Sequence, residues 1–392
     1  MNADSIPRTA DFIILGAGVM GASIAFHLAR RHAGYIVVID KDHAGSGGSG
    51  RSSALIRMHY SFPPEVQLAL ISLKIFQHWQ DIVGEPGEFR KTGFVRIVHP
   101  GESEALRQNV AMQRNLGANV ELIDRHQLKE LEPDWQVDDV ELAAYEPDSG
   151  YGDGNIVAND FLSRARDLGA TYLSKTRSDS FLIEAGRIRG VQTDHGEIHA
   201  PIVIVATGPW TRPLFQSTGF DPPIETEFHQ VAILKNAPTM KPGAACIDSV
   251  TATYFRSDGS DKFLVGDFYG KCPIDPDNFS QRPSDIDLEE IIDRAARRLP
   301  KLAGAEVMRG VTGVYDVTPD SRPLFGPVPG IEGLHLCAGF SGMGFKISPA
   351  IGLVMSELII DGKARTVDIT PFRPNRFQEG QPIKADFEYK DD

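Results

Sequence analysis

The first forty residues alternate short apolar runs with a longer helical pattern. Residues 12–15 are four apolar residues in a row, which is the length of a buried parallel strand. Residues 22–31 place Ala25 and Leu28 on one helical face, and residues 35–39 form a second run rich in β-branched side chains. This order of strand, helix and strand predicts a β–α–β unit at the start of the chain.

The rest of the chain continues both patterns in separate regions. Helical spacing of apolar residues predicts helices over residues 65–83, 102–116, 124–131, 156–169, 287–299 and 348–360. Short apolar or alternating runs predict strands over residues 93–98, 177–184, 187–193, 202–206 and 334–338, and further strands between residues 228 and 267. Strands that end in glycine turns therefore occur at both ends of the chain, and a strand-rich region lies between them.

This distribution predicts an α/β (α+β) fold, in which a Rossmann-type domain is interrupted by an inserted sheet-based domain. We expect the Rossmann-type domain to be assembled from residues 1–85, 150–220 and 310–377, and the inserted domain from residues 86–149 and 221–309. Residues 378–392 are charged and are expected to form a flexible tail. A ligand is expected in the cleft between the two domains.

A G-x-G-x-x-G pattern of Gly16, Gly18 and Gly21 joins the first predicted strand to the first helix, and Asp40 ends the second strand. The three glycines allow a tight turn, close approach of a pyrophosphate to the backbone, and close packing of helix on strand. The helix N-terminus supplies N–H groups for phosphates, and a carboxylate at Asp40 can accept hydrogen bonds from a ribose. The pattern predicts a dinucleotide site and leaves NAD and FAD open.

Composition and charge exclude several other classes. The net charge of −13 disfavours nucleic acid as a partner, and the composition, 41% hydrophobic and 24% charged, is that of a globular protein. Cys246, Cys272 and Cys337 have no metal-binding spacing, so we expect no metal site and reduced thiols. Residues 1–11 lack a signal-peptide pattern and glycines break the apolar run over residues 12–28, which predicts a cytoplasmic protein without a transmembrane segment.

Five motifs, in order along nearly the whole chain, resemble those of a known family: GAGVMG (residues 16–21), GRSSALIR (50–57), ATGPW (206–210), TPDSRPLFGP (318–327) and GFSGMGFKISPAIG (339–352). The chain is similar to the FAD-dependent amine and amino-acid oxidoreductases of the D-amino-acid oxidase superfamily, sarcosine oxidase and dehydrogenase branch. The resemblance implies an FAD-binding domain, a substrate domain, and oxidation of a C–N bond by hydride transfer to FAD, with hydrolysis of the imine.

The resemblance also implies the cofactor contacts. The expected FAD-binding residues are Gly16, Gly18, Val19, Met20, Gly21, Asp40, Lys41, Ser46, Gly50, Arg51, Ser52, Ser53, Ala206, Thr207, Gly208, Trp210, Gly339, Gly342, Met343, Gly344, Phe345 and Lys346. Monomeric sarcosine oxidases attach the flavin through a cysteine shortly before the TPD motif, where this chain has Gly313. We therefore expect FAD to be bound non-covalently.

For the substrate, the resemblance implies that Arg57 and Lys346 hold a carboxylate. Arginine binds a carboxylate through two hydrogen bonds, and lysine adds a point charge. Tyr254 and Arg256 are expected to line the cleft from the inserted sheet. Leu264 stands where the family's oxidases carry an oxygen-activating lysine, and Lys262 has the same strand parity, so the electron acceptor stays open.

Three alternatives accompany the leading interpretation of an FAD enzyme for a small amino acid or an N-methyl or secondary amine. The first is an NAD-linked dehydrogenase, and the second is a D-amino-acid dehydrogenase. The third is a flavin subunit that passes electrons to a partner protein, because GRSSALIR resembles the heteromeric sarcosine oxidase β subunits.

Overall fold

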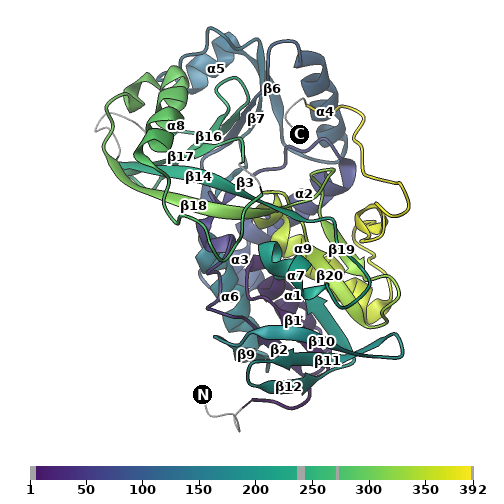
Figure 1. Cartoon of the computed structure of the whole chain (residues 1–392). Helices are drawn as coiled ribbons and strands as arrows, with labels where there is room; N and C mark the ends of the chain where they lie inside the picture. Colours follow the sequence, from purple (N-terminus) through teal and green to yellow (C-terminus); the bar gives the residue numbers. More distant parts are fainter. Residues whose placement is uncertain (1–5, 236–242, 271–272, 390–392) are drawn as a thin grey trace.

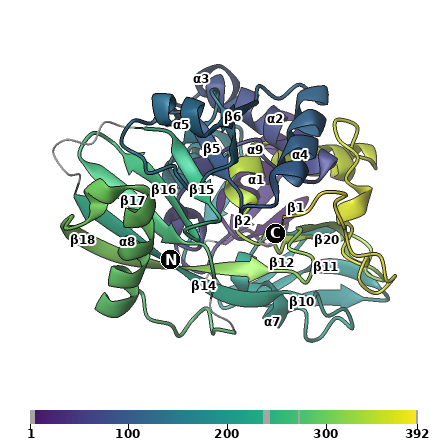
Figure 2. The same cartoon turned by 90° about the horizontal axis from the view of Figure 1, so that it is seen from above.

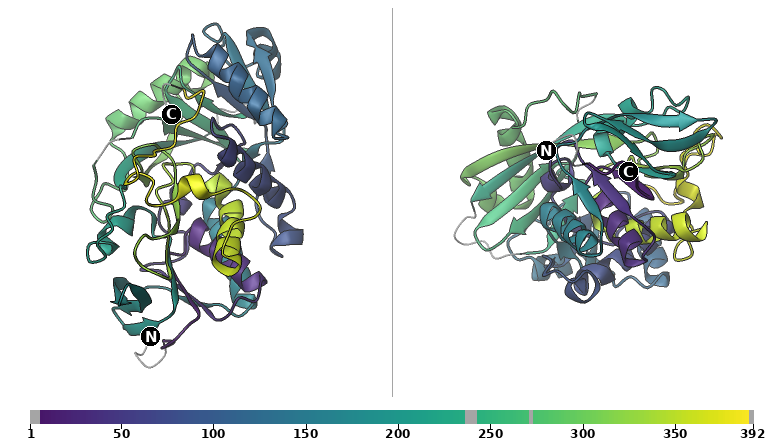
Figure 3. Two further views of the ribbon diagram at one scale, coloured as in Figure 1. Left: turned by 90° about the vertical axis from the view of Figure 1, so that its right-hand side faces the viewer. Right: turned by 90° about the horizontal axis from the view of Figure 1, so that it is seen from below.

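The computed structural model describes residues 6–235, 243–270 and 273–389. Two large sheets occupy opposite ends of the molecule, one of six strands and one of eight (Figure 1). The N-terminus lies at the six-stranded end and the C-terminus at the eight-stranded end (Figure 3). None of the helices in these described residues is long and apolar enough to cross a membrane.

The six-stranded sheet is the parallel sheet that the N-terminal pattern predicts. Its order is β19-β20-β13-β1-β2-β9, and only β19 runs antiparallel to its neighbour. The strands are β1 (Phe12–Leu15), β2 (Ile36–Ile39), β9 (Thr171–Leu173), β13 (Ile202–Val205), β19 (Leu324–Pro327) and β20 (Leu334–Ala338). Because β1 and β2 are buried on both faces, their side chains are apolar at every position rather than at alternate ones.

Different layers cover the two faces of this sheet. On one face pack α1 (Val19–Arg30), α6 (Gly154–Asp167) and α9 (Gly344–Asp361), which share a core with Ile14, Val38 and Ile204. On the other face lies a three-stranded sheet of β10 (Ser178–Glu184), β11 (Arg187–Thr193) and β12 (Gly196–His199), which share a core with Ile13, Val37 and Val203. Alternate residues of each strand thus belong to two separate cores.

The eight-stranded sheet has the order β18-β14-β17-β16-β15-β5-β7-β6. Its strands are β5 (Phe94–Ile97), β6 (Glu121–Asp124), β7 (Leu142–Glu146), β14 (Glu225–Lys235), β15 (Ala245–Asp248), β16 (Thr253–Asp258), β17 (Lys262–Asp267) and β18 (Val307–Val317). The long strands β14 and β18 run side by side across the molecule (Figure 2). Helices α5 (Arg125–Leu131) and α8 (Asp285–Arg298) cover one face of this sheet.

Shorter elements connect the two ends. The strands β3 (Leu55–Ile56), β8 (Gly150–Tyr151) and β4 (Arg90–Lys91) form a small sheet, and the remaining helices are α2 (Pro63–Gln77), α3 (Trp79–Ile82), α4 (Ser103–Asn115) and α7 (Thr211–Leu214). The six-stranded sheet draws its strands from residues 12–39, 171–205 and 324–338, and the eight-stranded sheet from residues 94–146 and 225–317. We retain the division into two domains as a proposal that this strand membership supports.

One predicted helix is divided in the structure, and another begins four residues earlier than predicted. The helix expected over residues 65–83 divides into α2 and α3 at His78. The last helix begins at Gly344 rather than at residue 348, so Lys346 lies in its first turn. That early start brings the Lys346 side chain to the glycine turn that precedes α9.

Part of the segment expected to form a flexible tail, residues 378–389, contacts the rest of the described structure; residues 390–392 lie outside the described residues. Ile383 and Tyr389 are buried, and the Ile383 N–H donates to Asp320 Oδ2 at 2.8 Å. The Tyr389 hydroxyl lies 2.8 Å from His59 Nε2, and the two rings stack. The prediction of a free tail rested on the charged composition of the segment. The position of the segment is instead fixed by the contacts of a few apolar and aromatic side chains.

Candidate active site

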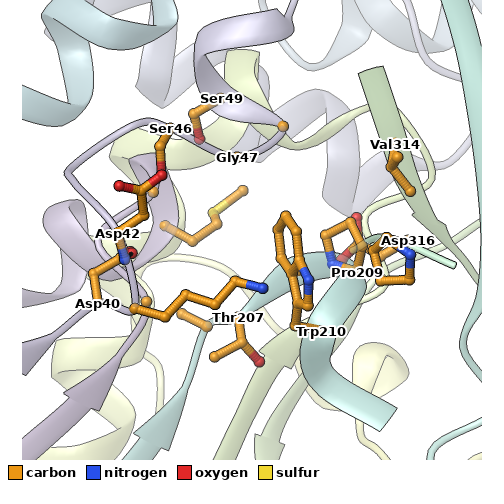
Figure 4. Close-up of a pocket in the computed structure, with 18 of the residues that line it drawn as sticks. Asp40, Asp42, Ser46, Gly47, Ser49, Thr207, Pro209, Trp210, Val314 and Asp316 are labelled. Atoms are coloured by element: carbon orange, nitrogen blue, oxygen red, sulfur yellow. Dashed lines mark hydrogen bonds between the residues drawn. The ribbon is translucent and has the colours of Figure 1, made fainter. Parts of the chain in front are cut away.

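A cavity of about 640 Å³ lies at the C-terminal ends of β1, β2 and β13. In open parallel sheets, ligands bind at this edge of the sheet. Asp40, Asp42, Ser46 and Ser49 lie on one side of the cavity, and Trp210, Pro209, Val314 and Asp316 lie on the other (Figure 4). The cavity therefore lies between the motif residues of the N-terminus and those of the middle and C-terminal segments.

Each of the three glycines of the N-terminal motif lies where the Cβ atom of any other residue would come too close to a neighbouring atom. A Cβ atom on Gly16, whose φ is +98°, would lie 2.4 Å from Ala206 O, and one on Gly21 would lie 1.9 Å from Gly16 O. A Cβ on Gly18 would lie 3.0 Å from Ser49 Oγ, which accepts a hydrogen bond from the Val19 N–H at 3.0 Å. Gly16 and Gly18 thus bring backbone to the wall of the cavity without a Cβ atom, and the Ser49 hydroxyl occupies the Val19 N–H beside them. This geometry fits the phosphates of a dinucleotide.

Asp40 fixes the same loop from the end of β2. Its Oδ2 accepts from the Ala17 N–H at 2.7 Å, and its Oδ1 accepts from the Asp42 N–H at 2.8 Å. Burial raises the pKa of Asp40, although these two hydrogen bonds oppose the shift. The carboxylate still lines the cavity, and each oxygen has a further lone pair, so it can also accept from a ribose hydroxyl.

A loop from the inserted sheet closes one part of this cavity. Asp277 Oδ1 lies 2.5 Å from Lys41 Nζ and accepts from Trp210 Nε1 at 2.8 Å, while Lys41 Nζ lies 4.0 Å from the centre of the Trp210 ring. All three residues line the cavity. We refer to Lys41, Trp210 and Asp277 as the clasp. It joins the two ends of the molecule across the cofactor cavity.

A second cavity of about 320 Å³ adjoins the first, because Ser52, Tyr315 and Gly342 line both. Of the predicted site residues, the second cavity is also lined by Ser53, Arg57, Tyr254, Met343 and Lys346. A substrate in the second cavity would therefore lie next to a cofactor in the first.

Arg57 and Lys346 give the second cavity a cationic wall. The Arg57 guanidinium lies 4.6 Å from the centre of the Tyr60 ring, Nη1 donates to His59 O, and Nε is buried without a hydrogen-bond partner among the described residues. Lys346 is buried and its Nζ donates to Gly342 O at 3.3 Å. In the described part of the chain, no carboxylate forms an ion pair with either residue. Two cations without a carboxylate partner are the arrangement expected of a site that binds an anionic ligand.

Burial, and next the charge of Arg57, hold the pKa of Lys346 well below its usual range. Arg322 also lines the cavity, but its Nε lies 3.3 Å from the buried Glu65 Oε2 and its Nη2 donates to Ser61 Oγ at 3.0 Å. Arg322 therefore already has a carboxylate partner, unlike the other two cations.

The structure places Arg256 behind the site rather than in it. Its side chain is buried, Nε donates to Ser53 O at 2.6 Å, and Nη1 donates to Asp258 Oδ1 at 2.9 Å. Arg256 shares a strand face with Tyr254, but the backbone at Ser53 covers it. We therefore assign Arg256 to holding the loop that follows Arg51, and not to substrate contact.

The predicted cofactor residues fall into three groups. Those that line the larger cavity are Gly16, Gly18, Val19, Met20, Asp40, Lys41, Ser46, Arg51, Ser52, Ala206, Thr207, Gly208, Trp210, Gly342, Gly344 and Phe345. Ser53, Met343 and Lys346 line only the smaller cavity. Gly21, Gly50 and Gly339 line neither and have packing roles; for example, a Cβ on Gly50 would lie 2.3 Å from Asn155 Oδ1.

Sequence reasoning missed a cluster at the junction of the two cavities. Tyr315 stacks on His229 with ring centres 4.0 Å apart, and His229 Nε2 lies 3.7 Å from Glu227 Oε2. Burial raises the pKa of Tyr315 and, more strongly, that of Tyr254, so both remain phenols at neutral pH. These residues come from β14, β16 and β18, and only the strand pairing, which the sequence does not mark, brings them together.

Cys246 and Cys337 are buried and free, and Cys272 lies outside the described residues. Cys337 lines the larger cavity, where burial and then the charge of Asp316 raise the pKa of its thiol far above the usual range. Gly313, at the position compared above with a flavin-linking cysteine, lies close to the loop that carries Arg51: a Cβ atom on Gly313 would be 3.4 Å from Arg51 Cβ. Among the described residues, no group of three or more His, Cys, Asp or Glu side chains is arranged to hold a metal ion.

The fold, the dinucleotide loop and the adjoining substrate-sized cavity define a flavoprotein oxidoreductase. The chain belongs to the FAD dependent oxidoreductase family (DAO), whose sequence profile matches residues 11–358. The expected family, fold class and FAD cofactor are thereby confirmed, and the alternative of an NAD-linked dehydrogenase is set aside.

Individual relatives extend over nearly the whole chain. The chain is 27% identical to FAD-dependent oxidoreductase domain-containing protein 1 of Mus musculus, over 96% of this chain and 87% of the relative. It is 25% identical to the sarcosine oxidase subunit beta of Arthrobacter sp, over 96% and 93% of the two chains. The crystal structure of L-proline dehydrogenase from P. horikoshii matches with a TM-score of 0.90 and 27% identity, over 96% of this chain and all of that chain (100%).

Proposed function

We propose that the protein oxidises the C–N bond of a small amino acid, or of an N-methyl or secondary amino acid, and that the imine product is then hydrolysed. The observation that carries the proposal is the cationic wall of Arg57 and Lys346, in a cavity that meets the FAD cavity at Ser52, Tyr315 and Gly342. The sarcosine and proline enzymes among the relatives support the same substrate class.

FAD, when bound, supplies the acceptor for a hydride from the carbon that bears the amine. The start of α1 at Gly18 would face its phosphates, and Asp40 would hold its ribose, whereas the N–H groups of Gly16 and Val19 already donate to Ile39 O and Ser49 Oγ. We propose that FAD is bound non-covalently, because no cysteine stands at Gly313 and the raised pKa keeps the Cys337 thiol protonated.

The residues of the smaller cavity orient the substrate. Arg57 would bind its carboxylate through two hydrogen bonds, and Lys346 would add a second positive charge. Tyr254 and Tyr315, which line the same cavity, supply neutral hydroxyl groups. A carboxylate fixed between the two cations turns the α-carbon and the amine toward the junction with the FAD cavity.

Our proposal for the electron acceptor rests on the wall of the inserted sheet. Leu264 is buried in an apolar cluster with Tyr254, and Lys262 does not line either cavity. No lysine of β17 therefore faces the site, and we propose an acceptor other than oxygen. The similarity to a sarcosine oxidase subunit beta favours a second form of this proposal, in which a partner subunit or protein accepts the electrons. The buried free thiols support a reducing compartment, the cytoplasm.

A substrate panel tests the proposal. The purified protein is mixed without oxygen with glycine, sarcosine, N,N-dimethylglycine, D-alanine, and L- and D-proline, and the loss of flavin absorbance is recorded. We expect bleaching by at least one of them, and faster turnover with an artificial acceptor than with air. A flavoprotein that none of these compounds reduces would refute the proposed function.

A further inference from the structure

A buried carboxyl group lies behind the cationic wall of the smaller cavity. Glu146 is the last residue of β7, its side chain is fully buried, and it lines neither cavity. Its Oε2 accepts from the Met58 N–H at 2.8 Å and from the Ser149 hydroxyl at 2.5 Å. Because Met58 follows Arg57 directly in the chain, this carboxyl group of the inserted sheet holds the backbone that carries the arginine.

The surroundings of Glu146 suit both a carboxylate and a carboxylic acid. Its second oxygen, Oε1, is buried and has no hydrogen-bond partner among the described residues. A carboxylate would leave this oxygen charged and unpaired in the interior, which is costly. A carboxylic acid can donate from Oε2 to the Ser149 oxygen, because a hydroxyl group both donates and accepts. Ser149 can therefore serve either state by rotating its hydroxyl hydrogen.

Opposed influences act on the proton of Glu146. Burial raises the pKa of its carboxyl group to about 7, and the hydrogen bonds from Met58 and Ser149 and the charge of Arg57 oppose the shift. A substrate carboxylate at Arg57 would bring a further negative charge into this surrounding, and like charges disfavour each other's ionised forms. The binding of an anion at Arg57 should therefore raise the pKa of Glu146 further.

The charged and titratable groups around Glu146 come from several elements. They are Arg57, His59 and Tyr60 from the segment after β3, Arg96 on β5, Glu121 on β6, and the paired Lys91 and Asp148 beside β8. Burial keeps His59 neutral by lowering its pKa and keeps Tyr60 neutral by raising its pKa. The buried residues of α4, which packs against β7, carry no charge. Arg57 connects Glu146 to a ligand, because Arg57 lines the cavity.

We propose that Glu146 is a positioning residue for Arg57 and that it takes up a proton when a carboxylate binds at Arg57. The proton comes from the solvent and binds to one carboxylate oxygen of Glu146, so a negative charge inside the protein is removed as the charge of the ligand arrives. No bond of the ligand forms or breaks in this step. The inference rests on the proposed function, because it concerns the same cationic wall, and it makes substrate binding dependent on pH.

The test uses the FAD-loaded protein with acetate and cyclopentanecarboxylate, which carry a carboxylate but no titrating nitrogen. Their affinities are read from the flavin spectrum against pH, and proton uptake is measured by calorimetry in two buffers with different ionisation enthalpies. With a pKa of about 7, Glu146 is half protonated near pH 7 in the ligand-free protein. We therefore expect uptake of about half a proton there, and an affinity that falls as pH rises, by at most about tenfold per pH unit.

Lys346 lies in the same cavity with a pKa well below its usual range, so its own titration is removed first with Lys346→Met. In that background, Glu146→Gln keeps an acceptor for the Met58 N–H and has the charge of the neutral acid. It should abolish proton uptake near pH 7 and should bind both carboxylates near pH 8 at least as tightly as Lys346→Met alone. A merely structural role of Glu146 would instead weaken binding at every pH.

Glu132→Gln, in the same background, is the matched control. Burial also raises the pKa of Glu132 to about 7, and its Oε1 accepts from the Ala244 N–H at 2.6 Å. Glu132 lines neither cavity, and its hydrogen bond holds a different segment of the chain. The control should leave both proton uptake and the pH dependence of the affinity unchanged.

Proton uptake that persists in Glu146→Gln, or weaker binding at every pH, would overturn the inference and leave the proposed function standing. If neither carboxylate binds to wild type, the inference and the cationic wall of the proposed function fail together. If Glu146→Gln does not retain FAD, Ser149→Ala decides the question. It removes a hydrogen bond that lowers the pKa of Glu146, so the midpoint of the pH dependence should move upward, and an unchanged midpoint would overturn the inference.

Discussion

Replacing Lys346 by methionine should change catalysis and stability in opposite directions. Lys346 is buried, has no ion-pair partner in the described part of the chain, and shares its cavity with Arg57. A structural lysine would contribute to the fold, and its loss would lower both activity and stability. A lysine that serves an anionic ligand should do the reverse for stability, because burial and the charge of Arg57 oppose its protonation and the charge of Glu65 offsets them only in part.

The catalytic loss follows from the charge that remains. Without Lys346, the substrate carboxylate keeps only Arg57 and is partly unpaired, which costs about 2–5 kcal/mol for a buried charge pair. At 1.4 kcal/mol per tenfold, kcat/KM should fall by roughly 30-fold to several thousand-fold. The same amine with its acid replaced by an amide should lose much less, because the amide carries no charge for Lys346 to neutralise.

The stability change has the opposite sign. Because burial lowers the pKa of Lys346, the unfolded chain binds this proton more readily than the folded chain does. The side chain therefore destabilises the fold at every pH below its ordinary pKa near 10.4, and most strongly at the acid end of that range. Lys346→Met should melt at the same temperature as wild type or higher, with a difference that grows as pH falls.

Thermal melting of ligand-free protein and anaerobic flavin reduction supply the two measurements. Lys235→Met is the matched control, because Lys235 is an exposed lysine at the end of β14 and lines neither cavity. It should leave both quantities unchanged. A Lys346→Met variant that melts clearly below wild type, or that keeps the preference for the acid over the amide, would refute this reasoning.

Three further predictions concern the cofactor and the tail. Asp40→Ala should lower FAD occupancy, because it removes the acceptor of the Ala17 N–H and a ribose contact, each worth roughly 1.5–3 kcal/mol for a charged hydrogen bond; a flavin titration measures the change. Asp277→Ala should open the clasp and speed FAD release by no more than about fivefold, with less salt dependence than wild type, since the clasp is exposed. Tyr389→Ala should lower the melting temperature by removing the stack on His59, and unchanged melting would show that the tail contributes nothing.

The parts of the fold that were predictable are those set by local spacing. Gly16, Gly18 and Asp40 lie within one β–α–β unit, so their roles follow from a pattern that the chain carries in a single stretch. The start of α9 was misplaced because Ser348 and Pro349 form a typical helix start, yet the helix already begins at Gly344. Ser348 and Pro349 do form a helix-start pattern, but the glycine turn that precedes Gly344 sets the observed start of α9.

The residues that were missed or misplaced depend on contacts between distant segments. His229 pairs with Gly313 across the sheet, and no feature of either strand marks that register. Arg256 shares a strand face with Tyr254 as predicted, but alternation does not reveal that the backbone at Ser53 lies over one of them. The strand face on which a residue lies can be inferred from alternation in the sequence. Whether that residue reaches a cavity depends on which other segments of the chain pack over that face.

The charges that line the smaller cavity suit the proposed substrate. Neither Arg57 nor Lys346 forms an ion pair with a carboxylate in the described part of the chain, and buried charges are costly unless they are paired. In the proposed function, the carboxylate of the substrate supplies that pairing. An amine without a carboxylate would leave both cations without it. Discrimination against simple amines would therefore follow from the cost of two unpaired cations and would not require a tight steric fit.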